Sequence, residues 1–300
     1  MEKTKKLSFL ADLGLVLVAI VWGTGFVASK NAISETTPMM VMSIRFTVAF
    51  IVSLIIFRKH LKNISKETLK VGCIIGFFLF TAFAAQTIGL QFMLAGKQAF
   101  ITATNVVMVP FIYWAVKKHR PDRYNFVAAF IMLLGIALLT TDFSSGLNFG
   151  TGDILTLICA FLFACHIVSI DIFSKNHDPI TLTVIQLGFT AILSLFYVVF
   201  TGDITVNISS VGWINCIYLG LFSTFLAFLI QTIAQKYTSS THAAIIMSLE
   251  SVFGSIFSIL ILDELFTPIM LLGCVIIFAG VITAETKWSF LKKKATNLIE

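Results

Sequence analysis

The chain is a regular succession of long apolar stretches separated by short polar ones. Ten stretches hold roughly 20 mostly apolar residues each, the length that a helix needs to cross the hydrocarbon layer of a membrane. They are continuously apolar and do not alternate with a period of two, which favours helices, because a helix satisfies its own backbone hydrogen bonds in lipid. The expected spans cover about 10–30, 39–57, 69–91, 95–116, 124–141, 152–174, 180–200, 211–234, 240–262 and 268–286. The pattern therefore predicts an all-α membrane protein with ten transmembrane helices.

The composition narrows the class, since 58% of the residues are hydrophobic and only 12% are charged. A soluble globule of this size would need more polar surface. The polar connections are short, and no linker or low-complexity tract marks a separate soluble domain. The basic N-terminus precedes an apolar run that continues to about residue 29 without a cleavage site of small residues. We therefore expect a first span there and not a signal peptide.

Basic residues are strongly biased to one side of the expected spans. One side holds 18 lysines and arginines, the other holds only Lys30 and Lys97, and Arg45 lies inside a span. Because basic residues beside the spans favour the cytoplasmic side, both termini are expected in the cytoplasm. The net charge of +6 then reflects topology and contact with anionic membrane lipid, and it does not indicate nucleic acid. The larger set consists of Lys3, Lys5, Lys6, Arg58, Lys59, Lys62, Lys66, Lys70, Lys117, Lys118, Arg120, Arg123, Lys175, Lys236, Lys287, Lys292, Lys293 and Lys294.

The two halves of the chain resemble each other. The triplet Gln86-Thr87-Ile88 recurs 145 positions later as Gln231-Thr232-Ile233. We expect two five-helix units, 1–145 and 146–288, and a basic cytoplasmic tail, 289–300. Since five is an odd number of spans, the second unit must enter the membrane upside down relative to the first. Further matches are Asn105 with Glu250 and Gly135 with Gly280 at an offset of 145, and Asp12 with Asp153 and Pro38 with Pro179 at an offset of 141.

An inverted repeat favours a transporter, because exchanging the conformations of the two halves turns an inward-open site into an outward-open one. The competing interpretation is a duplication that only enlarged a structural membrane protein. The five cysteines fall within expected spans without metal-ligand spacing, and no nucleophile, metalloprotease, P-loop or dinucleotide motif stands in a suitable context. A transporter with no metal, cofactor or catalytic residues is therefore favoured over an enzyme.

Polar side chains at membrane depth are costly unless they are paired, hydrated or turned toward a cavity, so they are the candidate binding residues. Glu250 is the deepest acid and is a candidate partner for an ammonium group or a proton; a structural carboxylate is the alternative. Gln98, Thr102 and Asn105 form a polar stripe on one face of the fourth span, and Asn105 occupies the repeat position of Glu250. The stripe indicates a cavity wall or an interhelical hydrogen-bond seam.

Four further residues complete the candidate site. Arg45 lies inside the second span and is a candidate for holding a substrate carboxylate, although an ion pair or a lipid headgroup explains it equally well. His166 in the sixth span is a packed histidine or, alternatively, a proton relay. Trp22 and Phe26 flank two glycines in the first span and are candidates for an apolar wall, with close helix packing as the alternative.

Three stretches carry a family resemblance: W-G-T-G-F-V-A-S-K from Trp22, I-R-F from Ile44, and S-L-E-S-V-F-G-S-I-F-S-I-L-I-L-D-E-L-F-T-P-I-M-L-L-G-C-V-I-I-F-A-G-V-I from Ser248. The chain resembles EamA-type transporters of the drug/metabolite transporter superfamily. The resemblance implies a central cavity lined by spans one, three, four, six, eight and nine, with spans five and ten supporting dimerisation or packing. It also implies amino acids, related metabolites or amphipathic drugs as substrates, often moved outward. Ser251 stands where the family pattern has a proline, which leaves the bend of span nine open.

A single deep acid with few basic residues favours a zwitterionic, cationic or neutral solute over a multiply charged anion. We therefore expect a secondary transporter in the plasma or inner membrane, monomeric or homodimeric, that exports amino acids or amines. Proton coupling and exchange remain open. The alternatives are an exporter of amphipathic cationic drugs, a lipid scramblase, and a membrane enzyme acting on lipid or prenyl substrates through acids such as Asp171 and Asp178.

Overall fold

The computed structural model describes residues 2–62, 64–142, 146–147, 149–204 and 207–286, and the expected basic tail 289–300 lies outside them. Over these residues, eight helical spans are long and apolar enough to cross a membrane, and two shorter apolar helices accompany them, Arg123–Leu139 and Pro268–Ala284. All ten expected spans are therefore helical, and the fold class predicted from the apolar pattern is confirmed.

Several spans are built from more than one helical segment. The first half contains α1 (Glu2–Ile33), α2 (Pro38–Phe57), α3 (Lys66–Gly89) with a 3₁₀ turn (Leu90–Phe92), α4 (Ala95–Thr102), α5 (Asn105–Lys117) and α6 (Arg123–Leu139). A two-stranded antiparallel hairpin, β1 (Thr141–Asp142) and β2 (Gly146–Leu147), joins the halves. The second half contains α7 (Thr151–Phe173), α8 (Pro179–Thr201), α9 (Ser210–Tyr218), a π-helical segment (Leu219–Leu226), α10 (Ala227–Gln235), α11 (Ser240–Met247), α12 (Glu250–Leu262) and α13 (Pro268–Thr286).

The structure contains the repeat that the sequence predicts. Helices α4 and α5 and their counterparts α11 and α12 have the same lengths and begin 145 positions apart. Even the left-handed residues that end α5 and α12, Lys118 and Asp263, are 145 positions apart. Equivalent helices also run in opposite directions, since Gly135 of α6 meets Ile277 of α13 while Met132 meets Gly280. The second unit is thus inverted relative to the first.

The fourth and ninth spans are each interrupted in the middle. The breaks fall at Ala103–Thr104 and at Ser248–Leu249, directly before Asn105 and Glu250. Hydroxyl groups at both breaks donate to the carbonyl three residues earlier, Thr104 to Ile101 and Ser248 to Ile245, each at 2.6 Å. Such side-chain bonds compete with the helical backbone pattern, and they accompany both breaks. Pro110, by contrast, lies inside α5 and does not cause the break.

Ser251 takes part in the break of the ninth span. Its hydroxyl donates to the Ser248 carbonyl at 2.8 Å, so a serine takes part in the interruption at the place where the family pattern has a proline. The span is interrupted although the proline is missing.

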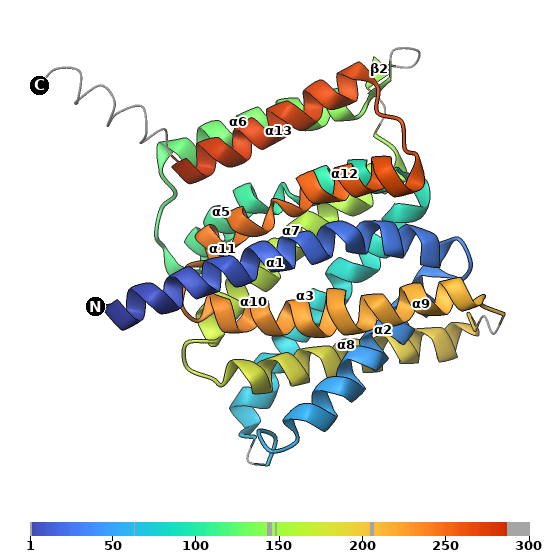
Figure 1. Ribbon diagram of the computed structural model, residues 1–300. Coiled ribbons are helices and arrows are strands. Elements are labelled where there is room, and N and C mark those ends of the chain that lie inside the picture. The colour runs from blue at the N-terminus through green and yellow to red at the C-terminus, as the bar shows by residue number, and fades with distance from the viewer. Residues whose placement is uncertain (1, 63, 143–145, 148, 205–206, 287–300) are drawn as a thin grey trace, which may run out of the picture.

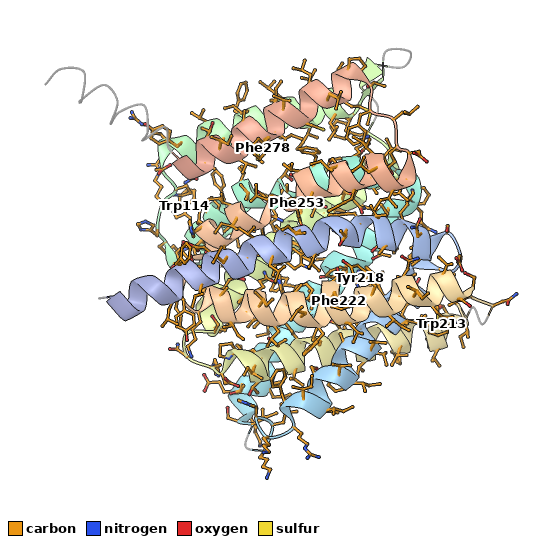
Figure 2. All side chains as sticks on the ribbon, in the orientation of Figure 1. Trp114, Trp213, Tyr218, Phe222, Phe253 and Phe278 are labelled. Atoms are coloured by element: carbon orange, nitrogen blue, oxygen red, sulfur yellow. The ribbon has the colours of Figure 1, made fainter. Side chains whose placement is uncertain are left out.

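The helices are stacked from one edge of the molecule to the other. Figure 1 shows α6 and α13 as a pair at one edge of the molecule, α2 and α8 at the opposite edge, and α1 and α7 between them. Apolar side chains project from the outside of the bundle, among them Trp213 of α9, Phe222 of the π-helical segment and Phe278 of α13 (Figure 2). Many of these outward side chains are largely exposed, as expected of a surface in contact with lipid.

Candidate functional site

A cavity lies inside the bundle, beside the residues that follow the two breaks and among α1, α2, α3 and α7. Its volume, taken as the space open to the centre of a water-sized sphere, is about 40 Å³. The cavity is lined by Trp22, Gly25, Phe26, Ser29, Arg45, Phe83, Gln86, Thr87, Leu90, Gln98, Asn105, Phe163, Ile167, Ser223, Gln231, Met247 and Glu250.

Glu250 brings an acid to the cavity wall. It is the first residue of α12, directly after the break, and only 6% of its surface is exposed. Among the described residues, no basic side chain forms an ion pair with it. The start of α12 favours a negative charge there, because the N-terminus of a helix carries a partial positive charge. The structure thus presents a buried acid that lacks a cationic partner among the described residues.

Arg45 brings a base to the same wall. It lies inside α2 and is 2% exposed. Its Nε donates to the Thr224 hydroxyl at 2.9 Å and Nη2 to the Ser223 hydroxyl at 3.4 Å, and its guanidinium lies 4.4 Å from the centre of the Phe83 ring. The π-helical segment places both hydroxyls, as such segments often do at functional sites. Within the described residues Arg45 has no carboxylate partner, so its charge is held only by neutral groups.

Amide side chains line the cavity with unused hydrogen-bonding atoms. Within the part of the chain that the structure describes, the side-chain oxygens of Gln98 and Asn105 have no hydrogen-bond partner, and neither amide atom of Gln231 has one. The Gln98 amide nitrogen is fixed by donation to the Gln86 carbonyl at 2.7 Å. A buried polar atom without a partner is costly, so these oxygens and nitrogens are suited to a polar ligand or to water.

The aromatic residues of the first span combine both roles that the sequence left open. Trp22 donates its indole N–H to the Ser223 carbonyl at 3.0 Å, and its ring lies 5.3 Å from that of Phe228. Trp22 and Phe26 both line the cavity. The glycine between them, Gly23, lies so close to α12 that a Cβ there would be 2.5 Å from the Cβ of Phe253. The glycines thus allow close packing while the aromatics form the wall.

Two of the expected site residues lie away from the wall. Thr102 is buried at the end of α4 but does not line the cavity. His166 is fully buried in α7, shares a hydrogen bond of 2.8 Å with the Gln186 amide oxygen and packs edge-on against Phe228. Their placement fits a supporting role and not direct contact with a solute.

The cavity also contains residues that sequence reasoning did not select. The sequence makes Gln86 and Gln231 stronger as evidence of duplication than as ligands, yet both line the wall. Their recurrence at an offset of 145 was the available signal, because equivalent positions of an inverted repeat meet near the midplane. Phe83, Phe163 and Ser223 carry no distinguishing pattern among the many aromatic and small residues of the spans.

Comparison with known families decides the class of protein. A model of the EamA-like transporter family matches twice, over residues 9–141 and 150–285. The chain belongs to the EamA-like transporter family. It is a multi-pass membrane transporter and not an enzyme, and its substrate is accordingly a small molecule. The two matches correspond to the two structural repeats of this EamA-like transporter.

Relatives agree with this assignment over nearly the whole length. An uncharacterised transporter of Archaeoglobus fulgidus is 35% identical, with 92% of this chain and 86% of the relative covered. A protein of Escherichia coli named "Probable amino-acid metabolite efflux pump" is 27% identical, with 88% and 91% covered, and one of the same name from Salmonella typhimurium is 25% identical. A crystal structure of 16% sequence identity matches with a TM-score of 0.71 over 94% of this chain and 98% of that chain, which supports the fold.

Proposed function

We propose that this EamA-like transporter exports small zwitterionic metabolites, amino acids first among them, across the plasma or inner membrane by alternating access. The observation that carries the proposal is the pairing of charges in the cavity. Glu250 and Arg45 are both buried, both line the wall, and neither has an ionic partner among the described residues. A solute with one ammonium and one carboxylate would complement both.

The proposed binding mode assigns a separate task to each part of the wall. Glu250 holds the ammonium group, and Arg45 holds the carboxylate with its planar guanidinium. Asn105, Gln98 and Gln231 supply neutral hydrogen bonds through their unused amide atoms. Trp22, Phe26 and Phe83 provide the apolar surface for a side chain. Two relatives named as amino-acid metabolite efflux pumps support this class of substrate and the outward direction.

A second candidate function is the export of amphipathic cations. The observation that favours it is the aromatic character of the wall, since cations bind well over aromatic rings beside an acid. Such a solute would use Glu250 and the rings but would leave Arg45 without a carboxylate. The role of Arg45 therefore separates the two candidates.

The proposal is tested by counterflow in proteoliposomes with a panel of amino acids, amines and organic acids, at several pH values. Saturable exchange of amino acids by the wild type and its loss in Glu250→Gln is the expected result. Glu67→Gln, which removes an exposed acid from the first turn of α3, is the matched control and should exchange like the wild type. Exchange of amines without amino acids favours the second candidate, and movement of lipid without any solute contradicts both.

A further inference from the structure

One end of the bundle, here called the Lys97 end, is closed by an ion pair between the two repeats. Nζ of Lys97, in α4, lies 2.8 Å from Oδ1 of Asp153, in the first turn of α7. Both side chains are largely buried, at 16% and 5% exposure. The pair joins the half-helix before the first break to the opening helix of the other repeat.

The opposite end, here called the His242 end, contains a matching contact. Nε2 of His242, in α11, lies 3.2 Å from Oδ1 of Asp12, in α1. This contact is an ion pair when the histidine ring is protonated. It joins the half-helix before the second break to the opening helix of the first repeat. Its side chains are about a third exposed, at 39% and 33%.

The two contacts are equivalent under the internal repeat. Lys97 and His242 are 145 positions apart, and Asp12 and Asp153 are 141 positions apart, which are the two offsets that relate the repeats elsewhere. The inverted arrangement puts the equivalent contacts at opposite ends of the cavity. Each therefore occupies a position where it can hold one end of the pathway shut.

The Lys97 end has additional ties. The Glu264 carboxylate accepts from the backbone N–H groups of Ala95 and Gly96 at 2.6 and 3.0 Å, at the start of α4. Lys30 donates to the carbonyls of Leu90 and Met93, both at 2.8 Å. The loop that leads into α4 is thus held from two sides.

The repeat equivalents of these ties differ at the His242 end. His119 occupies the position of Glu264 at an offset of 145, and Asp171 occupies that of Lys30 at the offset of 141 that relates α1 to α7. Lys175, just after the end of α7, forms an ion pair with Asp171 of α7, with 2.7 Å between Nζ and Oδ1. His119, Lys175 and Asp171 line a hollow of about 460 Å³ that reaches Ser240 at the start of α11. The structure is therefore more firmly closed at the Lys97 end.

We propose that Lys97–Asp153 and Asp12–His242 are the two gate contacts of the transporter, and that each must separate before its end of the cavity opens. They are positioning residues that set the balance between the two open states and do not contact the solute. The inference rests on transport by alternating access and is independent of which solute is carried.

The test measures thiol labelling of cavity cysteines in purified protein without substrate. Leu90 and Ile167 both line the cavity. The Leu90 carbonyl is bound by Lys30, at the Lys97 end, and the Ile167 carbonyl by Gln235, at the end of α10 toward α11. Leu90→Cys and Ile167→Cys therefore report on opposite ends. Tandem mass spectrometry that assigns the label to the substituted position keeps the native cysteines from interfering, including Cys165, two residues from the second probe.

Opposite responses of the two probes are expected. Asp153→Asn should raise the labelling rate at Leu90→Cys about threefold and lower it at Ile167→Cys, and Asp12→Asn should do the reverse. Lys97→Asp combined with Asp153→Lys should return both rates toward the wild type, and Glu67→Gln should leave them unchanged. A purely structural role would not move the two probes in opposite directions.

Equal shifts at both probes, or unchanged rates in protein with the melting temperature of the control, overturn the proposal. Lys97→Gln and His242→Gln test the same contacts from the other side if an aspartate variant fails to fold. Because the assay uses no solute, a wrong assignment of the substrate leaves its outcome unaffected. Loss of amino-acid counterflow with intact opposite labelling would count against the substrate alone.

Discussion

At the scale of single residues, the cavity joins a buried acid, a buried base and several amides with unused atoms. Charged and polar groups of this kind are retained at a cost to stability, so their presence in one cavity supports the proposed binding role. The acid and the base come from different helices, because Glu250 lines the cavity from α12 and Arg45 from α2. Substitutions at the two charges should therefore affect different classes of solute.

The first prediction concerns Arg45. Arg45→Gln should reduce amino-acid counterflow about 10- to 100-fold, because a charge-assisted hydrogen bond to the carboxylate is lost. Amines without a carboxylate should be exchanged as well as before or better. The measurement is the ratio of initial counterflow rates for an amino acid and the corresponding amine. An equal loss for both solutes would show that Arg45 has a structural role and does not bind the carboxylate.

The second prediction concerns Gln231, whose amide lacks partners within the described part of the chain. Gln231→Met should raise the free energy of unfolding by about 1–3 kcal/mol while lowering transport, because it removes an unsatisfied buried amide. Gln186→Met is the matched control: Gln186 bonds His166 at 2.8 Å and Thr232 at 3.2 Å, so its loss should destabilise. Thermal unfolding in detergent measures both, and destabilisation by Gln231→Met would contradict the prediction.

Most of the residues predicted as a site from the sequence lie together in the structure. Six of the eight candidate residues line the cavity, because polar groups at membrane depth are rare and seldom face lipid. Thr102 belongs to the polar stripe expected between Gln98 and Asn105, but it is buried at the end of α4 without lining the cavity, which helical spacing alone does not reveal. Gln231 was passed over because a single sequence does not show which buried amides lack partners.

At the scale of elements, the apolar pattern predicted all ten helical spans, since each must satisfy its backbone within lipid. The breaks within the spans were harder to predict from the sequence. The break in span four lies before Pro110, the residue most apt to disturb that helix, and a threonine hydroxyl bond accompanies it, as a serine hydroxyl bond accompanies the break in span nine. The π-helical segment that places Ser223 and Thr224 beside Arg45 has no evident sequence signal.

The third prediction concerns the contact between α6 and α13, where glycines bring the backbones together. A Cβ at Gly273 would lie 2.8 Å from the Gly135 carbonyl oxygen and from the Leu139 nitrogen. Gly273→Ala should therefore cost about 1–3 kcal/mol, as overpacking generally does. A lower melting temperature in detergent is the expected observation.

Gly150→Ser is the control for that substitution. A Cβ at Gly150 would lie 3.7 Å from the nearest atom, Oδ2 of Asp153, and serine is well suited to the start of a helix. Its melting temperature should match or exceed that of the wild type. If Gly273→Ala is equally stable, the two helices can separate without loss, and the pair contributes little to the fold.

At the scale of the whole molecule, the inverted repeat and the distribution of charge together predict an orientation. Lys30 and Lys97 lie at the end that holds the α12–α13 loop, while the basic loop after α2 lies at the other end. The positive-inside rule then places both termini in the cytoplasm and the Lys97 end outside.

The fourth prediction tests this orientation in intact cells. Leu265, 87% exposed in the α12–α13 loop, should be labelled as Leu265→Cys by a membrane-impermeant maleimide. Lys59→Cys, in the exposed loop after α2, should be labelled only after permeabilisation. The unaltered chain, with its native cysteines, provides the background. The reverse pattern would place the termini outside and make the proposed transport direction untenable.

At Asn105 and Glu250 the two repeats share their helical geometry, because each residue begins a helix of the same length, but the two side chains differ in chemistry. Two separate copies of one unit, assembled as a homodimer, would have to present either two acids or two amides at these positions. Joining the copies in one chain removes that restriction, because each position can then change on its own. A cavity built from two inverted units can thus distinguish one end of a solute from the other. A solute with two different ends then has a single preferred orientation within it.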